Sequence, residues 1–141
     1  MIITTDNLNQ ARREIQTLKK ENKQIIVKAR EGEFNRKILE IKDVNVLLSL
    51  EIHNRKDKLK ERDSGLNEIL CTIAKKNNIK IGIDVDAIKK IPKKEKARVI
   101  ARLKQNIFLC KKIGTQLCFF PSSHYSRQDL QALIITLSGS T

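Results

Sequence analysis

The stretch "LKERDSGLNEILCTIAKKNNIKIGIDV", residues 59–85, contains the clearest helix–strand unit of the sequence. Apolar residues recur at helical spacing over 66–74, and the run over 79–85 is typical of a strand. The pattern predicts a helix that is capped by Asp63 or Ser64 and leads directly into the strand. Arg62 stands directly before these residues, and a helix cap does not require an arginine. Its position therefore raises the question of which group this end of the helix faces.

The same alternation of strand and helix patterns continues on both sides of this unit. Strands are predicted near 2–4, 25–27, 44–50 and 115–120. Helices are predicted from a cap at Asp6, through 34–41, after Pro92 with an end at Gly114, and from a cap at Ser126. Such alternation predicts βα units with a parallel sheet. The usual phosphate-binding glycine motifs of open sheets are missing, and 141 residues are fewer than the roughly 250 of a full (β/α)₈ barrel. We therefore predict one α/β domain over 1–141, a TIM-barrel-like fold with a shortened or incomplete barrel.

Composition indicates a globular cytoplasmic protein. Apolar residues make up 40% of the chain, and no apolar run approaches the roughly 20 residues of a membrane span. The first residues lack the features of a signal peptide. Cys71, Cys110 and Cys118 form no CxxC pair, which is typical of a reducing compartment and argues against a disulfide framework or a zinc site. We expect no membrane association.

Charge is the strongest functional signal in the sequence. The chain has 29 Lys and Arg against 16 Asp and Glu, a formal net charge of +13. Over residues 89–112, ten Lys or Arg side chains stand against Glu95 alone. A solvated helix face usually mixes both signs. The excess therefore favours a polyanionic partner such as nucleic acid over a protein that is merely basic and soluble.

Candidate catalytic groups are few. His53 and His124 have no partner at metal-ligand spacing, and each is interpreted as a solvated loop histidine. Asp84 and Asp86 follow a strand, where a pair of carboxylates could hold Mg²⁺; alternatively, Asp86 caps the next turn and Asp84 faces solvent. Cys110 lies on an apolar helix stripe, which is typical of a core residue. These groups form no convincing catalytic constellation.

The segment "ERDSGLNEILCTIAKKNNIKIGI" resembles the signature of ribonuclease P protein component 3, the archaeal counterpart of the 30-kDa eukaryotic subunit. Three further segments are similar to that family in the same order. They are "EGEFNRKILEIKDVNVLLSL", "KARVIARLKQNIFLCKKIGTQLCFFPSS" and "SRQDLQAL". The chain departs from the family at Ala29 and Arg30, where a Glu-Gly pair is usual, and at Gly82, where an acidic residue is common. The basic elements are retained and the acidic ones are lost.

The resemblance implies a TIM-like barrel related to the polymerase and histidinol phosphatase superfamily. It implies a subunit of the ribonucleoprotein endoribonuclease that removes the 5′ leader of precursor tRNA. The partners would be the catalytic RNA, precursor tRNA and the small RRM-like subunit. Mg²⁺ would be bound through the RNA and no cofactor by the protein. The alternative is a small metal-dependent phosphoesterase of the same superfamily, which needs several His and carboxylate ligands.

Two places in the sequence carry the main predicted RNA contacts. Arg62, Ser64 and Gly65 would form a phosphate-binding helix start, unless Asp63 caps the helix and Arg62 pairs with an acidic neighbour. Arg98 and Arg102, at i and i+4, would project outward together along phosphates. The full predicted RNA-binding set is Arg36, Arg62, Ser64, Gly65, Arg98, Arg102, Asn106, Lys111 and Lys112.

Members of the resembled family have additional chain at both ends, which bears on association. The units seen here alone would leave a sheet edge and apolar helix faces exposed. We therefore expect an oligomer or a heteromer. Phe108 lies opposite the core stripe of its helix and would suit such a contact.

Overall fold

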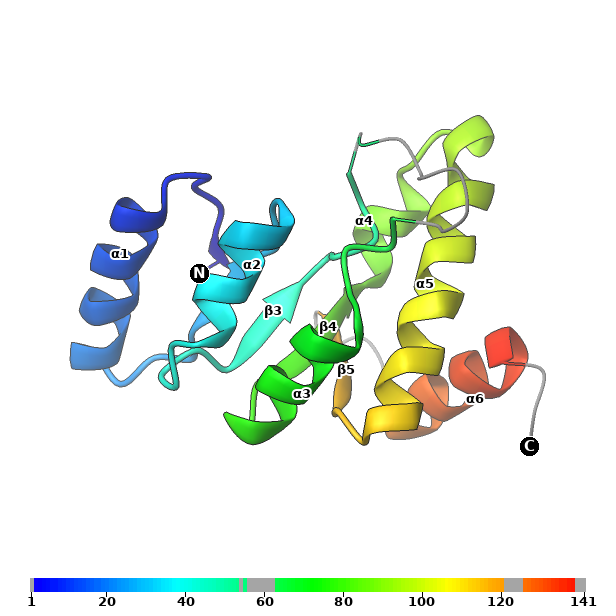
Figure 1. Cartoon of the computed structure of the whole chain (residues 1–141). Coiled ribbons are helices and arrows are strands. Elements are labelled where there is room, and N and C mark those ends of the chain that lie inside the picture. Colours follow the sequence, from blue (N-terminus) through cyan, green and yellow to red (C-terminus); the bar gives the residue numbers. More distant parts are fainter. Residues whose placement is uncertain (1, 54, 56–62, 121–125, 139–141) are drawn as a thin grey trace.

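The computed structural model describes residues 2–53, 55, 63–120 and 126–138. Five strands alternate with helices along the chain, as the sequence predicts (Figure 1). The elements are β1 (Ile2–Ile3), α1 (Leu8–Lys20), β2 (Ile26–Lys28), α2 (Gly32–Leu39), β3 (Val46–Leu48), α3 (Glu68–Lys76), β4 (Lys80–Asp84), α4 (Val85–Lys89), α5 (Lys93–Ile113), β5 (Leu117–Phe120) and α6 (Arg127–Ser138).

All five strands are parallel, and their order in the sheet is β1-β2-β3-β4-β5. Every strand pairs with its neighbour in the chain, as in a barrel, whereas a doubly wound sheet reverses its order part-way. Right-handed crossovers in one direction place the helices on one side of a sheet. In Figure 1, α2 and α3 lie in front of the strands, between α1 on the left and α5 on the right. The predicted α/β fold with partial TIM-barrel-like units is confirmed.

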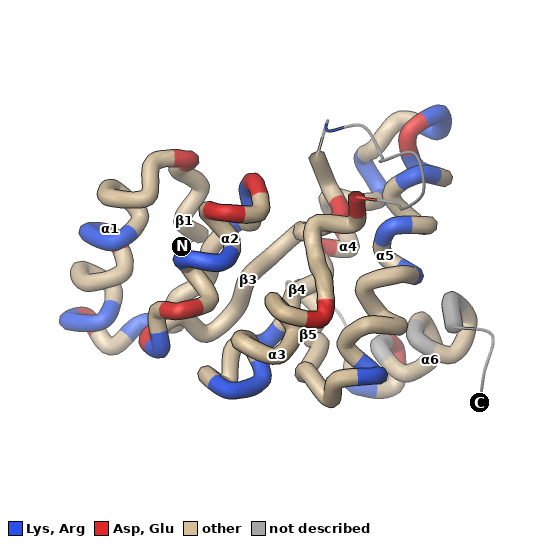
Figure 2. The backbone as a smooth tube through the Cα atoms, in the orientation of Figure 1, with Lys and Arg blue, Asp and Glu red and all other residues tan. Residues whose placement is uncertain are grey.

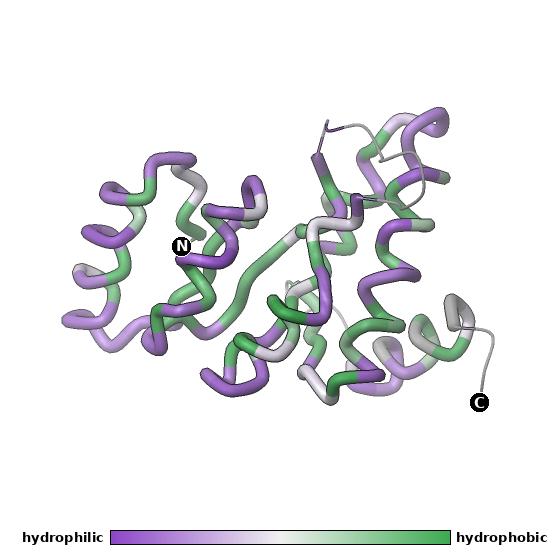
Figure 3. The backbone as a smooth tube through the Cα atoms, in the orientation of Figure 1, coloured by the Kyte–Doolittle hydropathy of each residue, from purple (hydrophilic) through white to green (hydrophobic). Residues whose placement is uncertain are grey.

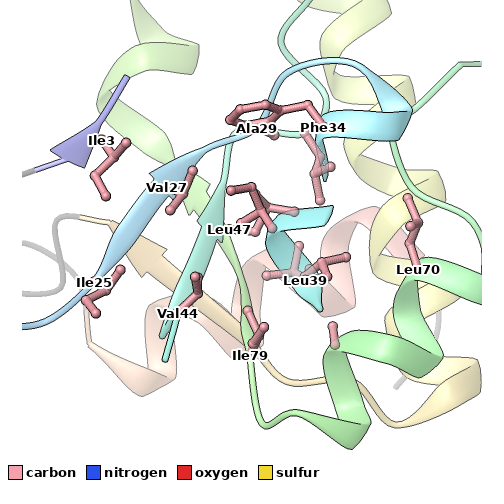
Figure 4. Close-up of a cluster of buried hydrophobic side chains, with 14 of the residues drawn as sticks. Ile3, Ile25, Val27, Ala29, Phe34, Leu39, Val44, Leu47, Leu70 and Ile79 are labelled. Atoms are coloured by element: carbon pink, nitrogen blue, oxygen red, sulfur yellow. The ribbon is translucent and has the colours of Figure 1, made fainter. Parts of the chain in front are cut away.

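The main core lies between the strands and the helices. Val27 and Leu47, from neighbouring strands, lie among Phe34 and Leu39 of α2 and Leu70 of α3 (Figure 4). All five side chains are buried. Because successive strand residues point to opposite faces, the residues on either side of Leu47 lie on the other face of the sheet. The strands and the inner helix faces accordingly form the hydrophobic part of Figure 3.

The opposite face of the sheet is filled by the strands themselves. Val46 and Leu48 of β3 belong to a small apolar cluster with Ile26 of β2. Gly82 of β4 lies beside them, and a Cβ atom there would be 2.7 Å from Val46 Cγ1 and 2.8 Å from Leu48 Cδ1. A larger side chain would need space that β3 occupies. The acidic residue common in the resembled family therefore has no room at this position.

Replacing Gly82 should test this close packing. We expect Gly82→Ala to lower the free energy of unfolding by about 1–3 kcal/mol, because an added methyl group overpacks the buried face. Gly32→Ala is the matched control, since a Cβ at Gly32 meets no atom within 4 Å. Chemical denaturation followed by circular dichroism measures both. If Gly82→Ala is as stable as wild type, β3 and β4 can shift apart at little cost to accommodate the added methyl group, and the close packing is not important for stability.

Element boundaries differ from the sequence prediction in several places. Asn7, and not Asp6, caps α1, because its side-chain oxygen accepts the backbone N–H of Gln10 at 3.1 Å. The short helix α4 was not predicted. Ser126 precedes α6 as predicted, and its Oγ accepts the backbone N–H of Asp129 at 3.1 Å. Gly114 ends α5 as predicted, in the left-handed conformation with φ of 89°.

Candidate nucleic-acid interface

The segment over 63–66 is a tight turn and not the start of a helix. The carboxylate of Asp63 accepts the backbone N–H of Gly65 at 3.1 Å, and Gly65 has a φ of 84°. Helix α3 begins at Glu68, and its cap is Asn67, whose side chain accepts the backbone N–H of Leu70 at 2.8 Å. The predicted cap at Asp63 or Ser64 is therefore wrong. Gly65 has a left-handed conformation that a helix start cannot use.

This turn is packed against the end of β3. A Cβ atom at Gly65 would lie 2.3 Å from the backbone oxygen of Leu50. Ser64 is buried, and its hydroxyl donates to the backbone oxygen of Leu66 at 3.2 Å. Both residues accordingly have structural roles in the turn. Contact of either with RNA stays a prediction, and Arg62 lies outside the described residues.

Arg102 connects α5 to the loop after β3. Its guanidinium donates to the backbone oxygens of His53 at 3.1 Å and of Arg55 at 2.9 Å. The residue is only 1% exposed. The prediction that Arg102 reaches outward beside Arg98 is wrong, because these carbonyls take its guanidinium into the interior. Arg98 is exposed, as predicted.

Asn106, one turn further along α5, holds the tight turn in place. The residue is fully buried, and its Nδ2 donates to the backbone oxygen of Ser64 at 3.0 Å. The neighbouring Gln105 donates to the Ser64 hydroxyl at 3.2 Å. Asn106 was predicted to bind RNA, and in the structure it is buried and stabilises the turn. Helical spacing could have placed it near the core stripe, but it could not reveal the turn that it contacts.

A cluster of ionisable side chains that the sequence did not indicate lies beside the turn. Arg55 Nε donates to Asp63 Oδ2 at 3.1 Å. Burial raises the pKa of Asp63, but the hydrogen bond and charge of Arg55 outweigh it and hold that pKa below its usual value. His53 Nε2 lies 2.6 Å from the backbone oxygen of Asp63, and the His53 side chain is 7% exposed. The interpretation of His53 as a solvated histidine is wrong, and burial lowers its pKa.

Arginine also lines a hollow of about 540 Å³ at the carboxyl ends of β2 and β3, the usual place for ligands in parallel sheets. Arg30 Nη2 donates to the backbone oxygen of Thr4, and Arg55 Nη1 donates to the backbone oxygen of Arg30 at 3.3 Å. Asp6 and Glu31 line the same hollow. With both signs of charge present and both guanidinium groups bound to carbonyls, the hollow is better suited to holding strand-end loops together than to binding a phosphate.

Acidic side chains at the strand ends are also used structurally. Asp84 caps α4, since its carboxylate accepts the backbone N–H of Ala87 at 3.0 Å. Of the two interpretations of Asp84 and Asp86, the one without Mg²⁺ had placed the cap at Asp86. Glu51 is 1% exposed, and burial, helped by the nearby charge of Asp84, raises its pKa to about 7. Among the described residues, no group of three or more His, Cys, Asp or Glu side chains could hold a metal ion.

The remaining predicted contacts lie on the surface. Lys111 and Lys112 are exposed near the end of α5, and Lys112 forms an ion pair with Glu68 at 2.5 Å. Arg36 is exposed on α2 and pairs with Glu40 at 3.5 Å. Lys and Arg recur along the length of α5 in Figure 2. A surface of this kind provides phosphate contacts without base selectivity. RNA binding by these residues stays a prediction.

Comparison with known proteins finds distant relatives of this chain that share one description. The chain is 26% identical over 113 residues to the ribonuclease P protein component 3 of Methanococcus vannielii, covering 80% of this chain and 46% of that protein. It is 24% identical over 113 residues to the protein of the same description from Methanococcus maripaludis. The chain is a distant homologue of archaeal ribonuclease P protein component 3. It spans less than half the length of these component 3 proteins, and no family model matches it.

Two solved structures share the fold of this chain. A chain in the cryo-EM structure of archaeal ribonuclease P with mature tRNA matches with a TM-score of 0.72 at 21% identity, over 97% of this chain and 58% of that one. The crystal structure of an uncharacterised protein matches with a TM-score of 0.59 at 11% identity, over 94% of this chain and 34% of that one. Within the described part of the chain, no helix has the length and apolarity that crossing a membrane requires.

Proposed function

We propose that this chain is an RNA-binding protein subunit of ribonuclease P, which stabilises the catalytic RNA for removal of the 5′ leader of precursor tRNA. The observation that carries the proposal is the homology to component 3, which covers 80% of this chain. The match to a chain in archaeal ribonuclease P supports it at the level of fold. The chain spans 46% of the length of the Methanococcus vannielii component 3. The activity and the partners of the ribonuclease P complex are therefore part of this proposal.

The charges and the strand ends support a role in binding and not in catalysis. A formal net charge of +13 suits a polyanion. Three ionisable side chains near the strand ends stabilise the fold. Asp84 caps α4, His53 contacts the turn over 63–66, and Arg102 binds the loop after β3. Catalysis and Mg²⁺ binding are accordingly assigned to the RNA. The protein partner would be the small RRM-like subunit, in a heteromer or a larger oligomer.

Recovery of RNA with the tagged chain tests the proposal. We expect the chain, purified from its own cells, to bring down one abundant RNA that cleaves precursor tRNA when the other protein subunits are present. Adding the chain to the remaining components should lower the Mg²⁺ concentration that cleavage requires. Recovery without RNA, together with hydrolysis of a simple phosphoester by the chain alone, would support the phosphoesterase alternative.

Arg98 and Arg102 were predicted to contact phosphate together. Arg98 is exposed and accessible to RNA, whereas Arg102 is buried. We expect Arg98→Ala to weaken RNA binding and to lower the slope of log affinity against log salt by about 0.7–0.9, the value of one lost phosphate contact. Cleavage should fall at low Mg²⁺ and recover at high Mg²⁺. Arg12→Ala, which removes the same charge from an exposed position on α1, is the matched control and should leave the slope unchanged. A loss of cleavage that Mg²⁺ cannot restore, at unchanged affinity, would contradict a charge-screening role.

A further inference from the structure

The face of α5 that points away from the core has an unusual composition. Its residues recur every three or four positions, as one side of a helix requires. We call the set Lys94, Ala97, Ala101, Lys104, Phe108 and Lys111 the outer stripe of α5. Ala101 is partly exposed and the other five residues are exposed. From residue 96 to the end of α5 at Ile113, the sequence contains no acidic residue.

Phe108 is the exception within this basic stripe. Its exposed fraction is 64%, and the other large hydrophobic residues exposed in the described chain are Ile69 at 61% and Ile135 at 47%. Phe108 is the aromatic one of the three. Lys104 precedes it by four positions and Lys111 follows it by three, so both are its neighbours on the helix surface. The structure therefore presents an aromatic ring between two ammonium groups on a rigid 21-residue helix.

This combination fits nucleic acid better than another protein. A protein-binding patch is usually a contiguous apolar area, with lysine depleted at its centre. Here three of the four nearest helical neighbours of Phe108 are lysines, and the fourth is Gln105. The lysines would repel one another less if a polyanion lay between them. An aromatic face can stack on any base, while cations on either side follow the phosphates of the same strand.

We propose that Phe108 stacks on an unpaired base of RNA, with Lys104 and Lys111 placed to contact the phosphates on either side. The inference rests on the proposed RNA-binding function and adds the feature that is recognised: a single-stranded segment, since the bases of a helix are already stacked on one another. Stacking on a base would let this surface distinguish single-stranded from double-stranded RNA, which phosphate contacts alone cannot do.

The absence of tryptophan from the sequence allows a direct measurement. Phe108→Trp would place the single tryptophan of the chain on the outer stripe, where its emission can be excited apart from that of the one tyrosine. We expect its fluorescence to be quenched by a short single-stranded oligoadenylate RNA, and much less by an RNA duplex of the same length at the same phosphate concentration. Quenching by the two RNAs to equal extents at saturation would overturn the proposal, because contact with phosphates alone does not distinguish them.

Affinity measurements separate stacking from simple apolar contact. Phe108→Ala and Phe108→Leu should each weaken binding of the single-stranded RNA by roughly 5- to 150-fold, the value of one stacked base. Both variants lose the π face, although leucine keeps most of the apolar area. Binding of the duplex should stay near the wild-type value. Ile69→Ala, at a similarly exposed residue on α3, is the matched control and should bind both RNAs as wild type does.

The remaining outcomes are distinct from one another. If Phe108→Leu binds single strands like wild type while Phe108→Ala does not, the contact is apolar and the stacking proposal is wrong. If both variants bind RNA like wild type but dissociate an oligomer or a protein partner, Phe108 is a protein contact and the proposal is again wrong. If wild type itself binds no RNA of either kind, the proposed function fails as well. If only the stacking proposal is wrong, the wild-type protein still binds RNA, and its affinity still depends on salt concentration.

Discussion

Arg102→Ala should destabilise the fold by about 3–5 kcal/mol, whereas Arg98→Ala, one turn away, should leave stability unchanged. The buried guanidinium of Arg102 donates to two backbone oxygens, at His53 and Arg55. Hydrogen bonds from a charged donor contribute about 1.5–3 kcal/mol each, and the substitution removes the donor from both carbonyls. Such a loss is a large fraction of the roughly 5–15 kcal/mol that stabilises a typical domain.

Chemical denaturation of both variants provides the measurement. Arg102→Lys should lie between wild type and Arg102→Ala, because one ammonium group cannot reproduce the fork of a guanidinium. If Arg102→Ala unfolds like wild type and instead loses RNA affinity with a lower salt slope, the arginine serves the phosphate role that its spacing first indicated. A fall in RNA affinity only in proportion to the unfolded fraction is the expected result.

Glu51→Gln should stabilise the protein in alkaline solution by on the order of 3 kcal/mol and have little effect in acid. The pKa of Glu51 rises from an ordinary 4.5 to about 7 in the folded protein, mainly through burial. Because the folded state holds this proton more tightly than the unfolded state, wild-type stability is fully present below 4.5 and is lost as pH rises through 7. Each unit of pKa shift corresponds to about 1.4 kcal/mol.

Denaturation of wild type and Glu51→Gln at about pH 5 and about pH 8 measures the difference. The amide cannot ionise, so the variant should lack the alkaline loss that wild type shows. Glu33→Gln removes an exposed carboxylate from α2, and this control should keep the wild-type difference between the two conditions. A Glu51→Gln protein that loses as much stability as wild type at about pH 8 would show that the loss arises at another group.

Sequence patterns predicted the fold well because its signals are local. Periodicity over residues 66–74 and 79–85 placed α3 and β4 close to their observed positions, and Gly114 marked the end of α5. The strands were predicted longer than observed, since apolar residues continue beyond the last ladder hydrogen bond. The start of α3 was placed several residues too early, because Asp-Ser-Gly can either cap a helix or form a turn.

The candidate site was predicted less well because its contacts cross the chain. Arg102 and Asn106 lie beside the core stripe of α5, and their partners at 53–55 and Ser64 are more than forty residues away. Spacing on one helix shows which side chains share a face, but not which loop will cover that face. Exposure of Arg98 and Phe108 could be predicted, since the core stripe by itself determines the opposite side.

The sequential strand order also bears on how the chain folds. β2, β3 and β4 each pair with the strand before and the strand after in the chain, while β1 and β5 have one neighbour each in the described sheet. Within the described sheet, no strand pairing joins the two ends of the chain. The entropy of loop closure is therefore divided among four crossovers of moderate length. The sheet can therefore begin at any adjacent pair of strands and grow by one strand–helix unit at a time, in the manner of a repeat protein.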